Sequence, residues 1–153
     1  MTFTESIKTV VFKKYATFKG RASRSEYWWY SLFASLISLL GAVIASTLYG
    51  DPSELTLFDI VWLLIFLPGL AVGIRRLHDV NKSGWWLIFP LASLILTPVI
   101  SLFEEHGLMD SAIGISISLL FLFGFLIGLY VLYLAIKKSD SGENQHGKNP
   151  VEG

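Results

Sequence analysis

The chain has 153 residues, of which 53% are hydrophobic and 16% charged, and its 12 basic and 12 acidic side chains give a formal net charge of zero. A soluble domain normally carries about 25% charged residues, and here the apolar residues come in long uninterrupted runs, which is typical of an integral membrane protein. The neutral balance argues against nucleic acid as a partner, and the absence of cysteine excludes disulfides and thiolate metal sites.

The segment before the first apolar run is predicted to form an amphipathic helix over about residues 3–18. Apolar side chains recur at helical spacing, with Glu5 and Lys13 on the opposite face, and this pattern suits a helix that lies in the membrane interface. The motif "SRSE" at residues 23–26 then matches a capping box that opens the next helix. The apolar positions are Phe3, Ile7, Val10, Val11, Tyr15 and Phe18.

Four apolar runs follow, and each comes near the roughly 20 residues that a helix needs to cross about 30 Å of hydrocarbon. Backbone groups find no water inside lipid, so the runs should be helical. The predicted fold is therefore an all-α membrane protein with four transmembrane helices preceded by an interfacial helix. Prolines at 68, 90 and 98 are expected to kink the second and third spans. The spans cover about residues 27–49, 57–74, 85–103 and 113–136.

The basic residues predict the orientation of these spans. All 12 lysines and arginines lie before the first span, between the second and third, or after the fourth, and the other two loops carry acidic residues instead. The positive-inside rule therefore puts both termini in the cytoplasm. Residues 1–138 are expected to form a single integral membrane domain. Residues 139–153 form a polar cytoplasmic tail, flexible by default or, alternatively, docked on the arginines.

Charged residues cluster in "GIRRLHDVNKSGWW", residues 73–86, the turn between the second and third spans. One interpretation is that they mark orientation and form a local ion-pair network, for example between Arg75 and Asp79. The other is that they join two arginines near residue 21 in a pocket for an anionic lipid head or a phosphorylated ligand. A third interpretation is that Glu26, Asp79 and the arginines form a cluster in which their charges neutralise one another. The candidate ligand-binding residues are Arg21, Arg24, Arg75, Arg76, His78 and Asp79.

Two motifs resemble a known family. "FKGRASRSEYWWYSLF" and "IRRLHDVNKSGWW" are similar to elements of the bacterial membrane proteins grouped as domain of unknown function 805. The matching positions are Gly20, Arg21, Arg24, Tyr27 and Trp28, then residues 75–79, then residues 83–86. The tail differs from the family pattern in having His146 where a tyrosine is expected. The resemblance implies an integral protein of the bacterial inner (plasma) membrane and supplies no reaction.

The sequence offers no metal site, cofactor site or catalytic set, because His78 and Asp79 are adjacent on a helix and point about 100° apart. We therefore predict a non-enzymatic structural, sensing or interaction module built as a four-helix bundle; the alternative is a component of an oligomeric channel or transporter. The lipid bilayer, with anionic phospholipid, is the expected partner. The pairs Gly69/Gly73 and Gly124/Gly128 allow close helix packing, either within the chain or in a homo-oligomer.

Overall fold

The computed structural model describes residues 1–48, 57–92, 96, 100 and 111–151. Within these ranges the chain forms helices and turns and has no strand beyond an isolated bridge between Asn144 and Gly147, which confirms the all-α prediction. Three helices are long and apolar enough to cross a membrane, and they lie at the first, second and fourth predicted spans. They are α2 (Arg24–Leu48), α3 (Leu57–Asp79) and α5 (Ser111–Ile136).

The third predicted span lies largely outside the described residues. Its start is a short 3₁₀ helix, η2 (Gly84–Leu87), whose first turn is capped because the Ser83 hydroxyl accepts a hydrogen bond from the Trp85 amide at 3.3 Å. Residues 88–92, 96 and 100 are helical. The rest of that span, with Pro98, and the loop residues 49–56 and 104–110 fall outside the described part of the chain.

The N-terminal helix is shorter than predicted. It consists of α1 (Phe3–Ile7), opened by a capping box between Thr2 and Glu5, and a π-helical turn, η1 (Lys8–Lys13). Val10 is fully buried against the protein, and the Ser6 hydroxyl donates to the Glu26 carbonyl at 2.7 Å. The segment is therefore tied to the start of α2, and its location in the membrane interface stays a prediction.

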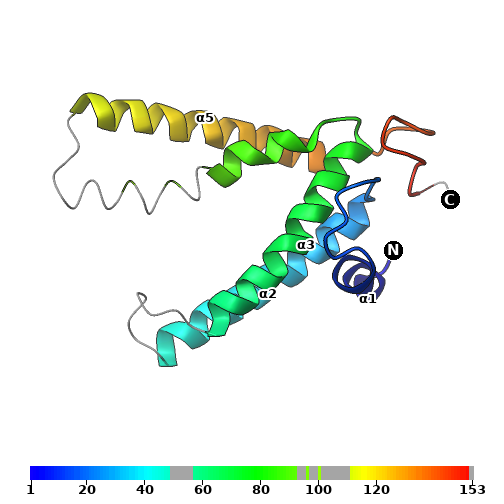
Figure 1. Cartoon of the computed structure of the whole chain (residues 1–153), viewed down its shortest axis with the longest axis horizontal. Helices are drawn as coiled ribbons and strands as arrows, with labels where there is room; N and C mark the ends of the chain where they lie inside the picture. The colour runs from blue at the N-terminus through cyan, green and yellow to red at the C-terminus, as the bar shows by residue number, and fades with distance from the viewer. Residues whose placement is uncertain (49–56, 93–95, 97–99, 101–110, 152–153) are drawn as a thin grey trace.

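The described helices pack as two pairs that meet at one end (Figure 1). Helices α2 and α3 lie side by side, and Gly69 of α3 faces the Tyr30 ring of α2, which a Cβ at Gly69 would approach to 3.4 Å, an ordinary contact. Helix α5 packs instead on residues 84–92, through Trp86 against Tyr130 and Phe89 against Phe123.

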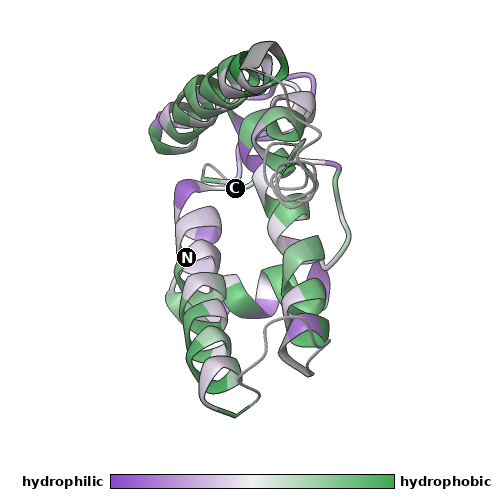
Figure 2. Ribbon diagram, turned by 90° about the vertical axis from the view of Figure 1, so that its left-hand side faces the viewer, coloured by the Kyte–Doolittle hydropathy of each residue, from purple (hydrophilic) through white to green (hydrophobic). Residues whose placement is uncertain are grey.

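The described helices do not pack as one bundle, so the prediction of a single four-helix bundle is not confirmed. Helix α5 diverges from α2 and α3 and joins α3 near the C-terminal ends of both (Figure 1). The joining cluster is Leu77, Val80, Ile127, Val131 and Leu134. A physical reason is that lipid tails are as apolar as leucine, so no hydrophobic force draws apolar helices into one bundle. Figure 2 shows hydrophobic residues along all three long helices.

Gly73 and Gly84 lie at close contacts within the chain, whereas Gly128 has room for a Cβ. A Cβ at Gly73 would lie 3.1 Å from Leu87, one at Gly128 would lie 3.8 Å from Pro90, and one at Gly84 would lie 2.7 Å from Ile74. The last distance is shorter than real Cβ contacts allow, so only glycine fits where the chain turns back after α3. A homo-oligomer through the Gly69/Gly73 or Gly124/Gly128 faces stays a prediction.

Two tyrosines donate hydrogen bonds to α3 carbonyls near Pro68, and one of them replaces the bond that this proline removes. Proline has no backbone N–H, so the carbonyl four residues earlier, that of Leu64, loses its helical partner. The Tyr15 hydroxyl donates to this carbonyl at 2.7 Å, and the Tyr30 hydroxyl donates to the next one, that of Ile65, at 2.5 Å. In lipid such carbonyls need partners within the protein. Tyr15 of the N-terminal segment therefore supplies the hydrogen bond that the α3 backbone lacks.

This pairing predicts a specific dependence between two substitutions. Tyr15→Phe should lower the free energy of unfolding by about 1–3 kcal/mol, because the Leu64 carbonyl is left without a donor. In a Pro68→Ala background, which restores the amide, the same substitution should cost much less. Denaturant titration of the protein in mild detergent measures both; equal costs in the two backgrounds would contradict the assignment.

Candidate functional site

Buried arginines gather where α2 begins and where α3 and α5 end. We call this region, residues 20–26, 75–82 and 137–149, the charged end; Figure 1 shows the tail beside these helix ends. Arg21, Arg75 and Arg76 are all buried here, together with two carboxylates, those of Glu26 and Asp79. Charged side chains are rarely buried unless they are paired, so their partners define the site.

The carboxylate of Asp79 binds two arginines at once. Its Oδ1 accepts from Arg21 Nε at 2.9 Å, and its Oδ2 accepts from Arg76 Nη1. The side chain of Asp79 has no exposed surface. The predicted pair between Arg75 and Asp79 is therefore wrong, because Arg76, one turn before Asp79, takes that position.

Arg75 binds Glu26 on the neighbouring helix instead. Its Nη1 donates to the Glu26 carboxylate, and both side chains are buried. The motif predicted as a capping box is used in part: the Ser23 hydroxyl accepts from the Glu26 amide at 3.2 Å, while the Glu26 carboxylate binds Arg75. A main-chain bond from the Ala22 amide to the Arg75 carbonyl, 3.0 Å long, runs alongside. Together these contacts join the start of α2 to the end of α3.

The tail supplies carbonyl oxygens to Arg21. Nη1 donates to the carbonyls of Gly142 at 2.7 Å and Gly147 at 3.2 Å, and Nη2 donates to that of Asp140 at 2.6 Å. Both glycines have positive φ, 67° and 118°, which glycine adopts readily. The described part of the tail is thus docked on Arg21, which the sequence offered as the alternative to a flexible tail.

Arg76 closes the end of α5. Its Nε donates to the Ala135 carbonyl at 3.1 Å, and its Nη2 donates to the Lys137 carbonyl. The last carbonyls of a helix have no partner within it, and a cation there also suits the helix dipole. Arg76 of α3 therefore caps the C-terminal end of α5.

The His78 side chain packs on the tail. Its ring stacks on that of His146, with centroids 3.8 Å apart and planes 1° from parallel, and its Nδ1 lies 3.2 Å from the Gly20 carbonyl oxygen. Asn144 Nδ2 donates to the His78 carbonyl at 3.0 Å. The pKa of His146 is lowered, mainly because burial disfavours the charged ring and also because Arg21 is near.

Arg24 stands apart from the other candidates. It is exposed on the first turn of α2, and it lines a cavity of about 490 Å³ with Lys138 and tail residues. The structure therefore brings together Arg21, Arg75, Arg76, His78 and Asp79, and it leaves Arg24 on the rim. Ligand binding by this set stays a prediction.

Sequence reasoning missed the contribution of the tail backbone. The carbonyls of Asp140, Gly142 and Gly147 carry no side-chain signature, and no spacing rule pairs them with Arg21. A partial signal was present, because Gly142 and Gly147 flank Asn144 in a turn-rich stretch.

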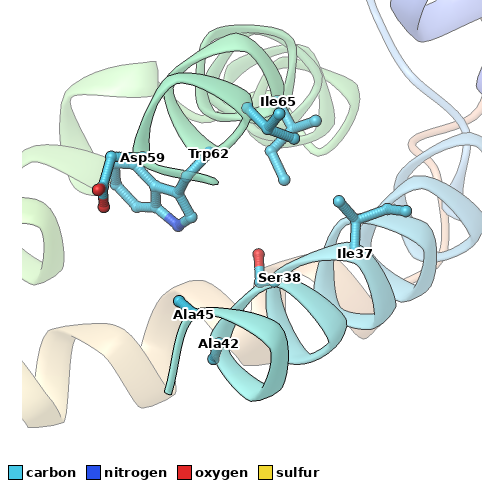
Figure 3. Close-up of a pocket in the computed structure, with 9 residues that line it drawn as sticks. Ile37, Ser38, Ala42, Ala45, Asp59, Trp62 and Ile65 are labelled. Atoms are coloured by element: carbon cyan, nitrogen blue, oxygen red, sulfur yellow. The ribbon is translucent and has the colours of Figure 1, made fainter. Parts of the chain in front are cut away.

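A separate cavity of about 170 Å³ lies between α2 and α3 at the end away from the arginines. Figure 3 shows Trp62 and Ile65 of α3 on one side of it and Ile37 and Ser38 of α2 on the other. Asp59, at the start of α3, supplies the only carboxylate among the lining residues. The channel or transporter alternative stays a prediction.

Comparison with known proteins places these observations in a family. The family model described as "Protein of unknown function (DUF805)" matches residues 15–148. "Inner membrane protein YhaI" of Escherichia coli (strain K12) is 31% identical over 94% of this chain and 93% of its own length. "Inner membrane protein YhaH" of the same strain is 38% identical over 61% of this chain and 79% of its own length. No solved structure matches.

Removing the carboxylate at position 79 tests the buried cluster. Asp79→Asn should lower the free energy of unfolding by about 3–5 kcal/mol, because Arg21 and Arg76 stay buried without their counter-charge. The tail should also become more accessible, so that trypsin cleaves after Lys148 sooner than in the unchanged protein. Glu143→Gln, at an exposed position, is the control and should change neither quantity; an unchanged cleavage rate in Asp79→Asn would contradict the role of this carboxylate.

The histidine stack predicts that tail docking depends on pH. The pKa of His146 is lowered from 6.5 when the tail is docked, so the docked tail favours the neutral ring. Docking should be complete above about pH 6.5 and weaken as the pH falls below it. A nitroxide at Glu143→Cys, in a chain that otherwise has no cysteine, reports tail mobility.

The matched variant for this titration is His146→Tyr. Tyrosine keeps an aromatic ring against His78 and does not titrate in this range, so the part of the increase in mobility that is due to His146 should disappear. The part due to His78, whose pKa is also lowered by burial, should remain. If the labelled chain that keeps His146 shows the same tail mobility from pH 8 to pH 5, the pH dependence is refuted.

Proposed function

Because the chain belongs to the family described as protein of unknown function (DUF805), we propose that it crosses the inner membrane four times, with both termini in the cytoplasm. The inner membrane itself follows from the relatives' names and from the apolar helices. Three of the four spans are the helices α2, α3 and α5, and the remaining one, the third in chain order, rests on the sequence of residues 85–103. The orientation rests on the basic residues, which gather where the charged end lies.

Tryptophans support the same placement of the charged end. Trp28 and Trp29 lie on the first turns of α2, Trp85 and Trp86 lie in η2, and all four are exposed. Indole rings are favoured at headgroup depth. The charged end would then lie at the cytoplasmic interface, with the exposed leucines and phenylalanines of the long helices in lipid.

The function that the geometry supports best is that of a non-enzymatic interaction module. The observation that carries it is the use of the charged groups: the buried arginines bind carboxylates and main-chain carbonyls of the same chain. Arg21 and Arg76 are engaged in this way and hold segments together, whereas Nε and Nη2 of Arg75 are buried without a hydrogen-bond partner among the described residues. The module presents the docked tail and the exposed basic residues of the charged end to the cytoplasm. We call these residues the basic rim; they are Arg24, Lys82, Lys137, Lys138 and Lys148.

We further propose that the rim binds anionic lipid or a phosphorylated ligand. Basic pockets between helices on the cytoplasmic side of a membrane attract anionic headgroups. The buried arginines support the rim by fixing the tail, and the exposed basic residues provide the charge.

Reporter fusions test the topology. Alkaline phosphatase, which is active only outside the cytoplasm, should be active when fused after Glu54 or Glu105 and inactive when fused after Gly153. A fluorescent protein that matures only in the cytoplasm should give the opposite pattern. Active phosphatase at Gly153 would place the C-terminus outside the cytoplasm and would overturn the proposal.

A further inference from the structure

Several basic side chains at the charged end, among them Arg24 and Lys138, lie outside the buried ion pairs. Arg24 opens α2, and Lys138 lies two residues beyond the end of α5. Both are exposed, and the ion pairs among described residues join other groups. They are nevertheless not scattered, because both line the same cavity of about 490 Å³.

The lining of this cavity suits an anion. Its described lining residues include two cations and no carboxylate, and their remaining polar side chains are hydroxyls and one amide. Its volume falls in the range of about 300–1,000 Å³ that is common for small-molecule sites. The first turn of α2 adds the positive end of a helix dipole. The hydroxyls are those of Ser23, Ser25, Ser139 and Ser141.

The tail forms one wall of the cavity. Ser139, Ser141 and Asn149 come from it, and Asn149 Nδ2 is held by a hydrogen bond to the Asp140 carbonyl at 3.2 Å. The Asp140 carbonyl also accepts from Arg21. The wall is therefore positioned by the buried cluster, and the cavity requires a docked tail.

The lining residues of the cavity come from the start of α2 and from the segment after α5. Arg24 is four residues from Trp28, and Lys138 is two residues beyond the end of α5. Side chains at this level of a membrane protein meet lipid phosphates. A guanidinium fork and an ammonium group that line one cavity match the oxygens of a phosphate group.

We propose that this cavity binds a phosphate group that carries net negative charge, with Arg24 and Lys138 as its charged contacts and the serine hydroxyls as hydrogen-bond donors. The inference rests on the proposed function, which assigns anion binding to the rim, and it names the site. The phosphate belongs either to an anionic phospholipid headgroup or to a soluble phosphorylated molecule, which share this chemistry.

Calorimetric titration in neutral detergent tests the site, since a detergent micelle lacks the negative surface that attracts every exposed lysine. Dihexanoyl phosphatidylglycerol is titrated into the full chain, with dihexanoyl phosphatidylcholine as the zwitterionic comparison. The double variant Arg24→Gln with Lys138→Gln should bind the anionic lipid at least about tenfold more weakly. Inorganic phosphate is titrated separately to distinguish the two sources.

The matched control is Lys19→Gln with Lys148→Gln, which removes the same charge from exposed positions that do not line the cavity. It should bind within about twofold of the unchanged chain. Arg24→Lys with Lys138→Arg keeps both charges and should also retain binding, which separates loss of charge from loss of fold.

The outcomes separate the site from the proposed function. Equal weakening in both double variants would leave anion binding in place and overturn the cavity as its site. Equal affinity of the unchanged chain for the anionic and zwitterionic lipids would overturn both. Binding of inorganic phosphate that needs Arg24 and Lys138 supports the site with a soluble phosphorylated ligand, whereas binding of the anionic lipid alone supports it with a headgroup.

Discussion

Asp79 presents a carboxylate without exposed surface to Arg21 on one side and Arg76 on the other. Each of these charges would be costly to bury alone, by several kcal/mol, so the three groups are stable only together. They come from two segments of the chain, and each arginine has a second set of partners. Arg21 binds the carbonyls of the tail, and Arg76 binds those at the end of α5. The position of the tail and the attachment of α5 therefore depend on one carboxylate.

This dependence matters because apolar helices in lipid attract one another weakly. The hydrophobic effect that packs a soluble core is absent between helices surrounded by hydrocarbon. The contacts that remain are close approaches at glycines and hydrogen bonds, such as those that Tyr15 and Tyr30 make to α3 around Pro68. The strongest contacts are gathered at the charged end, and α5 diverges from α2 and α3 away from it (Figure 1). The charged end thus joins the N-terminal segment, the long helices and the tail.

Much of this could be predicted from the sequence, and the failures have physical causes. Long apolar runs specify helices in lipid whatever their neighbours, so α2, α3 and α5 were found to within a few residues. Spacing rules describe partners on one helix, and they suggested a bond between Arg75 and Asp79. The structure pairs Arg75 with Glu26 across helices, which depends on how α2 and α3 are rotated. The docked tail was weighed only as an alternative, because its main-chain carbonyls leave no pattern in side chains. The family resemblance, carried by the two arginine motifs, was confirmed by the match over residues 15–148.

A double-mutant cycle between Arg21 and Asp79 tests most directly that their contact holds the charged end together. The free energy of unfolding in mild detergent is measured for Arg21→Gln, Asp79→Asn and the combination. Residues that share a buried ion pair couple by about 0.5–3 kcal/mol, and we expect a value above about 1 kcal/mol, with the tail released in all three variants. Additive single effects, or a tail that stays protected from protease when both groups are replaced, would contradict the account.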